Sequence, residues 1–459
     1  MSATDATTVR DLAARAKAAS RILATLSETE RNAALECIAT NVERAAPALF
    51  AANAEDLQAA QHLTGADALS PATLSRLKLT EAKLAEMTEG IRSVIALPDP
   101  LGRILGATEL DDQNPPGTNA APQHWQPGLH LQKITVPLGV LAVIFEARPD
   151  AVTQIAALAL KSGNAVILKA GREVERTATA LVQVLQQALR DQDLPADSIN
   201  LLLGRDQVLD LLGAHDLVDL VIPRGSRQLV EFVQANTRVP VLGHAEGICH
   251  IYVDRAADPN LALRVIADAK LDYPAACNAV ETVLIHRDLA ETFLPQLLGD
   301  LQSKGIRLHS DAAVQDIAKA RHFTQPTPVT DWHHEYGEPE LSLALVDSLP
   351  AAIAHIHQHG SSHTESILTE DPAAAEQFLR EVDAAGVFHN ASTRFADGFR
   401  YGFGAEVGIS TSKLHARGPV GLDGLTTYKY LLRGQGHIAA DYRGPNARTF
   451  THRPKTKPQ

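Results

Sequence analysis

A series of short, almost purely apolar runs begins near Ile134, and stretches with helical spacing separate one run from the next. This series constrains the fold more than any other feature. A strand without alternating polar residues is buried on both faces, which is typical of a parallel sheet covered by helices. We therefore predict an α/β fold, preceded by helices within the alanine- and leucine-rich residues 7–62 and by a further helix over about Glu81 to Ile95. The expected strands are Val140 to Phe145, Val166 to Leu168, Ile199 to Leu203, Leu217 to Ile222, Val239 to Leu242, His250 to Val253 and Val280 to Ile285.

Two expected strands are followed by residues that suit a nucleotide, and parallel sheets bind ligands at the carboxyl ends of their strands. Lys169 and Arg172 place two cations where a ribose or its 2′-phosphate could lie. Gly225 and Ser226 precede an amphipathic helix expected over 228–235, so Ser226 would cap it and free N–H groups could receive a pyrophosphate. Solvated charges and a simple capping serine fit these patterns equally well. No GxGxxG fingerprint supports an ordinary Rossmann site here.

The stretch from Leu271 to His286, LDYPAACNAVETVLIH, sets Cys277 between a turn and an apolar strand. The residue before Pro274 is driven out of the helical region, so the backbone turns there. Alanine and asparagine neighbours leave room for a substrate beside the thiol. A buried inert thiol is equally consistent with the local sequence. Cys37, in a helical pattern, and Cys249, at the start of an apolar strand, are better candidates for packing.

Length and charge exclude several classes of function. A chain of 459 residues exceeds the size of a single core, so two or more domains are expected. The formal net charge of -12 argues against a nucleic acid or an anionic membrane as partner. Asp5 and Asp11 interrupt the first residues, so we expect no signal peptide, and no apolar run approaches the length of a membrane span. Three cysteines without pairing or metal-knuckle spacing favour a reducing cytoplasm.

The region after residue 386 is dense in glycine and carries Arg394, Arg400 and Arg417. Frequent glycine among arginines indicates irregular backbone held close to something anionic, because glycine otherwise only weakens structure. The histidines of HIHQHG, at positions 355, 357 and 359, have a spacing that matches neither one helix face nor a closed zinc pattern. We interpret them as a solvated helix end and predict no metal site.

Several longer motifs together resemble the γ-glutamyl phosphate reductases, also called glutamate-5-semialdehyde dehydrogenases, a branch of the aldehyde dehydrogenase superfamily that serves proline biosynthesis. The resemblance extends from about residue 8 to about residue 440. The motifs are VIFEARPD, SGNAVILKAG, VIPRGS, LGHAEGICHIYVD, YPAACNAVET, HTESILTED and NASTRFADGFRYGFGAEVGISTSKLHARGPVGLDGLTTYKYLLRG.

The resemblance implies an aldehyde-dehydrogenase-like fold. A Rossmann-type NADP-binding domain would cover 1–107 and 131–245, and an α/β catalytic domain would cover 246–424. The segments 108–130 and 425–445 would pair between subunits of a homo-oligomer. The resemblance also implies a cytoplasmic enzyme that acts on glutamate 5-phosphate. Glutamate 5-kinase, which makes that labile substrate, would be a useful physical partner.

The resemblance also assigns roles to single residues. Cys277 would take the γ-glutamyl group as a thioester, and NADPH would then deliver hydride. Lys169 matches a ribose-side lysine, Ser226 matches a serine of the pyrophosphate helix, and Glu335 matches the glutamate that holds the nicotinamide ribose. The superfamily's oxyanion asparagine has no clear counterpart in FEARPD, so the resemblance assigns no oxyanion donor; the backbone N–H of Cys277 or the side chain of Asn278 could donate instead.

One departure from the wider superfamily is informative. Hydrolytic members carry a glutamate that activates water, and Gly243 occupies that place. A reductase must protect its thioester until hydride arrives, so a poised base would waste the intermediate. Glu246 lies three residues on and could substitute. We expect guanidinium groups to bind the two anionic ends of the substrate, with Arg148, Arg394 and Arg417 as candidates and structural ion pairs as the alternative.

Two alternative functions remain open at the level of sequence. A CoA-acylating aldehyde dehydrogenase would also lack the water base, but the RFADGFR block favours the phosphate reductase. A catalytically inactive scaffold paralogue is disfavoured by the intact Cys277 and cofactor motifs.

Overall fold

The computed structural model describes residues 8–62, 69, 71–115, 127–204, 206–244 and 246–455. The chain forms two compact units, which are described separately. Unit 1 comprises Met1–Val221, Thr237–Pro240 and Leu422–Gln459, and unit 2 comprises Ile222–Asn236 and Val241–Gly421. The expected domain boundary at residue 245 stays a prediction.

Unit 1 opens with helices, as the alanine- and leucine-rich amino-terminal sequence predicts. Ser27 begins one of them with a capping box, in which its hydroxyl accepts from the Glu30 N–H and the Glu30 carboxylate accepts from the Ser27 N–H. The helix predicted over Glu81 to Ile95 is confirmed. These helices are α1 (Val9–Leu23), α2 (Glu28–Arg44), α3 (Ala46–Gln61), α4 (Pro71–Leu77) and α5 (Glu81–Ile95).

Unit 1 contains a four-stranded sheet in the order β5-β4-β3-β6. β3, β4 and β5 run parallel, and β3 and β4 are buried along their whole length, as continuous apolar runs predict. The division between the two units passes through β6. The strands are β3 (Val140–Phe145), β4 (Ala165–Ala170), β5 (Ile199–Leu202) and β6 (Leu220–Arg224), and the intervening helices are α6 (Asp150–Lys161), α7 (Glu175–Arg190) and α8 (Gln207–Gly213).

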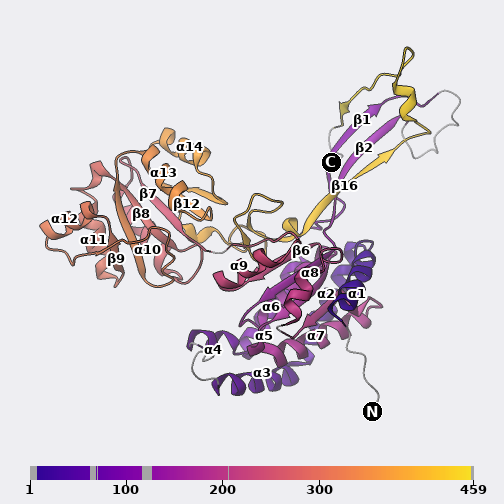
Figure 1. The fold of residues 1–459 in the computed structure, drawn as a ribbon, viewed down its shortest axis with the longest axis horizontal. Helices are drawn as coiled ribbons and strands as arrows, with labels where there is room; N and C mark the ends of the chain where they lie inside the picture. Colours follow the sequence, from indigo (N-terminus) through magenta and orange to yellow (C-terminus); the bar gives the residue numbers. More distant parts are fainter. Residues whose placement is uncertain are drawn as a thin grey trace. The chain divides into compact units, whose positions relative to one another are not determined.

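A second, antiparallel sheet of unit 1 joins distant parts of the sequence (Figure 1). Its order is β16-β2-β1-β17, and β16 pairs with β2 from Thr426 opposite Pro137 to Arg433 opposite His130. The second predicted oligomerisation segment, 425–445, therefore contains a strand that pairs inside one chain, mostly with residues that follow the first segment, 108–130. The strands are β1 (Ile104–Asp111), β2 (Leu129–Pro137), β16 (Thr426–Arg433) and β17 (Arg453–Pro454).

Unit 2 is built on a seven-stranded sheet in the order β10-β9-β11-β8-β7-β12-β13, in which every pair is parallel. Side chains alternate between its faces. Ile251 and Val253 enter one apolar core, whereas Tyr252 enters the other. The strands are β7 (Cys249–Val253), β8 (Val280–His286), β9 (Arg307–Ser310), β10 (Thr327–Pro328), β11 (Glu340–Val346), β12 (Thr364–Leu368) and β13 (Gly386–His389).

Helices cover both faces of the unit 2 sheet. Residues of α10, α11 and α12 pack in the first core, and residues of α13 and α14 pack in the second (Figure 1). These five helices are α10 (Pro259–Leu271), α11 (Leu294–Ser303), α12 (Ala312–Ala320), α13 (Leu349–His359) and α14 (Pro372–Glu381), and unit 2 also contains α9 (Arg227–Asn236), which enters neither core. Among the described residues, none of the helices combines the length and hydropathy of a membrane-spanning segment.

The structure corrects one strand prediction. The segment from Val239 to Leu242 is not a strand of either sheet, although the Val221 N–H donates to the Pro240 carbonyl at 2.9 Å. Proline has no N–H and cannot continue a ladder, so the apolar run is interrupted after one backbone hydrogen bond.

Candidate active site

Three polar side chains meet at the amino-terminal edge of the unit 2 sheet. His244 lies before β7, Cys277 before β8 and His363 directly before β12. These strands are parallel neighbours in the order β8-β7-β12, so their amino ends lie together. The position of Cys277 before its strand agrees with the loop-to-strand junction that the sequence predicts.

The loop that carries Cys277 is held from two sides. A Cβ added to Gly247 would lie 1.9 Å from the Cys277 carbonyl oxygen, so only glycine allows this approach of two backbones. The Cys249 thiol also contacts that oxygen, at 3.4 Å. On the other side, the Asn278 side chain is 4% exposed and donates to the Ala396 carbonyl at 2.9 Å. This amide thereby ties the cysteine loop to the glycine-rich block.

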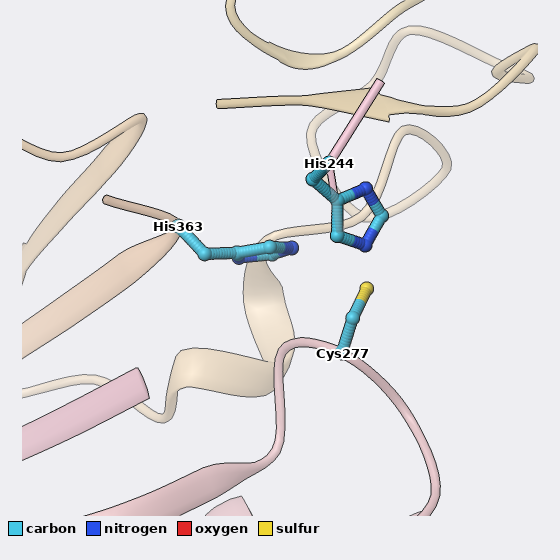
Figure 2. Close-up of side chains that lie close together, drawn as sticks. All are labelled: His244, Cys277 and His363. Atoms are coloured by element: carbon cyan, nitrogen blue, oxygen red, sulfur yellow. The ribbon is translucent and has the colours of Figure 1, made fainter. Parts of the chain in front are cut away.

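The sulfur of Cys277 has two imidazoles as neighbours. One side-chain nitrogen of His244, one of His363 and the sulfur all lie within 4.8 Å of one another. The two rings meet edge to face, with centroids 5.3 Å apart and an interplanar angle of 74°. His244 Nδ1 contacts the Ile409 carbonyl at 3.1 Å, so this nitrogen is the donor and Nε2 carries a lone pair. Figure 2 shows that Nε2 facing the sulfur.

Burial keeps all three groups of this cluster neutral. It raises the pKa of the Cys277 thiol to about 12, and the carboxylates of Glu335 and Glu406 act in the same direction against Arg394. Burial lowers the pKa of His363 to about 3 and also lowers the pKa of His244. The residue Cys277 is partly exposed, but its thiol is enclosed by protein. A neutral thiol beside a neutral imidazole can transfer its proton during a reaction, and need not do so before it.

A pair of arginines shares one carboxylate near the cysteine loop. Arg394 Nε and Arg400 Nη2 contact Asp272 Oδ2 at 3.0 and 2.9 Å. Arg400 also donates to the Arg394 carbonyl at 2.8 Å. These contacts, first with Arg400 and then with Arg394, lower the pKa of Asp272. Two guanidinium groups and one carboxylate leave one positive charge, which suits an anionic substrate.

Two positions bear on the activation of water: Gly243, where hydrolytic members carry a glutamate, and Glu246, which could substitute for it. A Cβ at Gly243 would lie 3.3 Å from the Pro223 ring, so even the first atom of a side chain is crowded there. Glu246 forms ion pairs with Arg227 and with His333 Nε2, the latter at 3.1 Å. These two ion pairs make the Glu246 carboxylate less available as a general base.

The predicted cofactor residues belong to both units. In unit 1, Lys169 ends the buried β4, is 6% exposed and donates to the Ala170 carbonyl at 2.5 Å, and Arg172 begins the following 3₁₀ turn. In unit 2, Gly225 follows β6, and the Ser226 hydroxyl accepts from the Leu229 N–H at 3.4 Å, as a helix cap does. Glu335 is close enough to influence the pKa values of Cys277 and His244.

The three predicted substrate arginines lie in different surroundings. Only Arg394 is placed beside the cysteine loop. Arg148 is exposed in unit 1, where it precedes α6. Arg417 contacts Asp383 Oδ1 at 2.7 Å in unit 2, and Lys413 contacts the same carboxylate.

Sequence analysis missed three residues of this site, His244, His363 and Asp272, and noted Arg400 only as part of the glycine-rich region. A usable signal existed, because His244 and His363 each precede a strand that contains buried apolar residues, as Cys277 does. The histidines of HIHQHG drew attention instead. The interpretation of a solvated helix end is wrong for His355, whose ring packs edge to face on His250 and Trp332.

Comparisons with known proteins identify the family of this chain. The family model described as "Aldehyde dehydrogenase family" matches residues 1–315. A γ-glutamyl phosphate reductase of Synechococcus sp. (strain JA-2-3B'a(2-13)) is 52% identical over 439 residues, covering 95% of this chain and 92% of the relative.

Solved structures give the same result. The crystal structure of γ-glutamyl phosphate reductase from Thermotoga maritima is 34% identical with a TM-score of 0.85, covering 93% of this chain and 99% of that one. An acetylating aldehyde dehydrogenase from Geobacillus thermoglucosidasius is 17% identical, covers 94% of this chain and 97% of that one, and shares the fold with a TM-score of 0.61. The chain belongs to the aldehyde dehydrogenase family and, within it, to the γ-glutamyl phosphate reductases.

Proposed function

We propose that this chain reduces L-glutamate 5-phosphate to L-glutamate 5-semialdehyde, with NADPH as reductant and inorganic phosphate as the second product, in L-proline biosynthesis. The proposal depends on one observation: the sulfur of Cys277 faces the Nε2 lone pair of His244 (Figure 2). It is supported by the 52% identity of this chain to a γ-glutamyl phosphate reductase. The cytoplasm is the expected location.

Cys277 is the proposed nucleophile. Its sulfur attacks the acyl carbon of the substrate, the S–C bond forms, and the C–O bond to phosphate breaks. The thiol proton moves to Nε2 of His244 and from there to the departing phosphate. The Ile409 carbonyl holds His244 in the required tautomer, because Nδ1 donates to it. A backbone N–H at Cys277 or the Asn278 amide stabilises the oxyanion, although one amide hydrogen of Asn278 already bonds to Ala396.

The resulting thioester is protected from water. Gly243 offers no carboxylate, and Glu246 is held by Arg227 and His333. Once the acyl carbon is reduced, the C–S bond breaks, and the Cys277 thiolate recovers a proton. A hydrolytic base in this position would divert the thioester to glutamate.

The residues available for a dinucleotide fit an anionic, phosphorylated one. A buried lysine at the end of a parallel strand, with an arginine close behind it, is a donor set for a ribose phosphate. Lys169 and Arg172 would hold that end, Gly225 and Ser226 the pyrophosphate, and Glu335 the nicotinamide ribose. When bound, NADPH supplies the hydride that reduces the acyl group.

Arg394 is the first candidate for substrate binding, and Arg148 and Arg417 remain candidates without assigned roles. Truncating Arg394 to alanine should raise the KM for substrate at least about tenfold, since a charge-assisted contact is lost, and leave the KM for cofactor nearly unchanged. Arg417→Ala is the matched comparison. Equal effects on both KM values would remove Arg394 from the substrate site.

Assembly is a further part of the proposal. β16 lies at the edge of its sheet and exposes Tyr428, Tyr430 and Leu432, so we propose that it pairs between subunits of a homo-oligomer. Deletion of 111–123, which is partly outside the described residues, should then shift the sedimentation coefficient. Association with glutamate 5-kinase is proposed on the chemistry of its labile product.

The reaction is best tested in reverse, because the acyl phosphate is unstable. Glutamate 5-semialdehyde, NADP and inorganic phosphate are mixed with the protein, and NADPH is followed by absorbance. NADPH should appear only when phosphate is present and should vanish in Cys277→Ala. Formation without phosphate would mean that water attacks the thioester, formation only with CoA would favour an acylating relative, and no formation would favour an inactive scaffold.

A further inference from the structure

We infer that His244, Cys277 and His363 form a binding site for a soft divalent cation of the Zn²⁺ class, and that an occupied site withholds the nucleophile. The cation-binding half of this inference is independent of the proposed reaction. The inhibitory half depends on Cys277 being the nucleophile.

The ligand atoms have the composition of a zinc site. Two imidazole nitrogens and one thiolate are ligands that Zn²⁺ prefers, with bonds of roughly 2.0–2.1 Å to nitrogen and about 2.3 Å to sulfur. In a tetrahedral arrangement with those bonds, the ligand atoms lie about 3.3–3.7 Å apart. The three atoms of this cluster already lie within 4.8 Å of one another, so a modest side-chain contraction closes the site.

Both histidines are oriented as metal ligands are. His244 Nδ1 contacts the Ile409 carbonyl at 3.1 Å, and His363 Nδ1 contacts the Thr364 hydroxyl at 2.8 Å. Metal-binding histidines commonly donate their second ring N–H to such a group, which fixes the ring and leaves the other nitrogen for the metal. Here the remaining nitrogens point into the cluster (Figure 2).

His363 supplies an independent indication of a ligand. The residue is 1% exposed, and its Nε2 has no hydrogen-bond partner within the described part of the chain. A buried polar atom without a partner is costly, and sites that bind ions are one place where such atoms occur. The unpartnered nitrogen faces the sulfur of Cys277 and the ring of His244 (Figure 2).

Three protein ligands leave one coordination position open, which is typical of a reactive or exchangeable zinc site and not of a closed structural one. Water or an anionic oxygen can complete it. On binding, Cys277 loses its proton to solvent and donates its sulfur lone pair to the cation. The sulfur is then unavailable to an acyl carbon until a chelator removes the cation.

Cobalt(II) is the probe for the test, because a cobalt–thiolate bond has a near-ultraviolet charge-transfer band and tetrahedral cobalt has strong visible bands. The metal-free full-length chain is titrated with Co²⁺ under reducing conditions. One equivalent should bind with both signals, and Zn²⁺ should displace it. Cys277→Ala should lose the charge-transfer band, while Cys37→Ser, which alters the partly exposed cysteine of α2, should keep it.

Three further variants separate a built site from incidental thiol binding. Thr364→Val removes the hydroxyl that orients His363 and should weaken Co²⁺ binding about tenfold or more. His244→Gln and His363→Gln should each abolish the tetrahedral spectrum, with circular dichroism as the check on folding. A charge-transfer band that persists in Cys277→Ala, or an affinity unchanged in all three of these variants, would overturn the site.

Inhibition by the bound cation is measured as a loss of NADPH formation in the reverse reaction. Zn²⁺ should abolish NADPH formation by the wild type at one equivalent, and a chelator should restore it. If Co²⁺ binds stoichiometrically and the reaction is not inhibited, then a bound cation does not keep the Cys277 sulfur from reacting, and Cys277 is not the nucleophile. An active enzyme without a thiolate–cobalt signal would overturn the metal site and leave the reductase proposal standing.

Discussion

Cys249 and Cys277 are neighbours, and the comparison between them separates a buried cysteine from the candidate nucleophile. The Cys249 thiol lies 3.4 Å from the Cys277 carbonyl oxygen, and burial raises the pKa of both thiols. Cys249 begins β7, is fully buried and has the Glu365 carboxylate as its main further influence. Cys277 lies in a loop beside two imidazoles with available lone pairs. Partial exposure and a proton acceptor within reach therefore distinguish the candidate nucleophile.

The largest expected effect is the loss of the sulfur itself. Cys277→Ala should lower kcat at least about 10⁴-fold, because no other group can form the thioester. Cys249→Ala should keep activity within about tenfold and lose about 1–2 kcal/mol of unfolding free energy through the cavity it leaves. Steady-state kinetics and urea unfolding measure these effects. Inactivity of a folded Cys249→Ala protein would break the comparison.

Removing the proton acceptor should have the next largest effect. His244→Gln should lower kcat about 10²–10⁴-fold with little change in the KM for substrate, since general-base assistance is lost while binding groups remain. His357→Gln is the control, because His357 is an exposed histidine of α13 in the same unit. A comparable fall in both variants, or a pure change in KM, would show that His244 does not take the thiol proton.

The ionisation state of the thiols can be measured by alkylation with iodoacetamide in the presence of a chelator. With a pKa of about 12, Cys277 is a thiol at neutral pH, so its alkylation should be at least about 100-fold slower than that of an ordinary cysteine at pH 7. The rate should rise with pH without a plateau below pH 10, and Cys249 should stay unmodified in the folded protein. Peptide mass spectrometry assigns the sites. A plateau near pH 6–7 would instead indicate a thiolate–imidazolium pair.

The smallest effect concerns the support of the loop. Gly247→Ala places a Cβ 1.9 Å from the Cys277 carbonyl oxygen, so the loop must shift, at a cost of about 1–3 kcal/mol and about tenfold or more in kcat. Gly243→Ala meets only the Pro223 ring at 3.3 Å and should be milder in both measurements. Thermal unfolding and kinetics of the two variants test this order, and the reverse order would show that Gly247 does not position Cys277.

Much of the fold follows from local sequence. Continuous apolar runs predicted β3, β4, β7 and β8, and the helix over Glu81 to Ile95 was predicted to its ends. The turn at Pro274 and the strand after it placed Cys277 at a loop-to-strand junction, as the structure has it. These features depend on neighbouring residues, so periodicity and turn chemistry are sufficient to find them.

The site was harder to predict, because the strand order creates it. His244, Cys277 and His363 are far apart in sequence and meet only because β8, β7 and β12 are adjacent. Nothing local in HTESILTED predicts which strand will lie beside β7. The general rule about carboxyl ends also directed attention to residues that follow β4 and β6, which belong to another sheet. The contact between Asp272 and Arg400 was missed for a similar reason, since it joins the end of α10 to a loop more than a hundred residues later.

The pairing of β16 with β2 has a consequence for folding during synthesis. Lys133 lies opposite Tyr430, and almost the whole of unit 2 separates these two residues in sequence. A ribosome must therefore release unit 2 before β2 can acquire this neighbour, and contacts of such long sequence separation form slowly. Until then the edge of β2 is unpaired and can pair with another chain. We therefore expect the antiparallel sheet to be completed last and to be exposed to aggregation for the longest time.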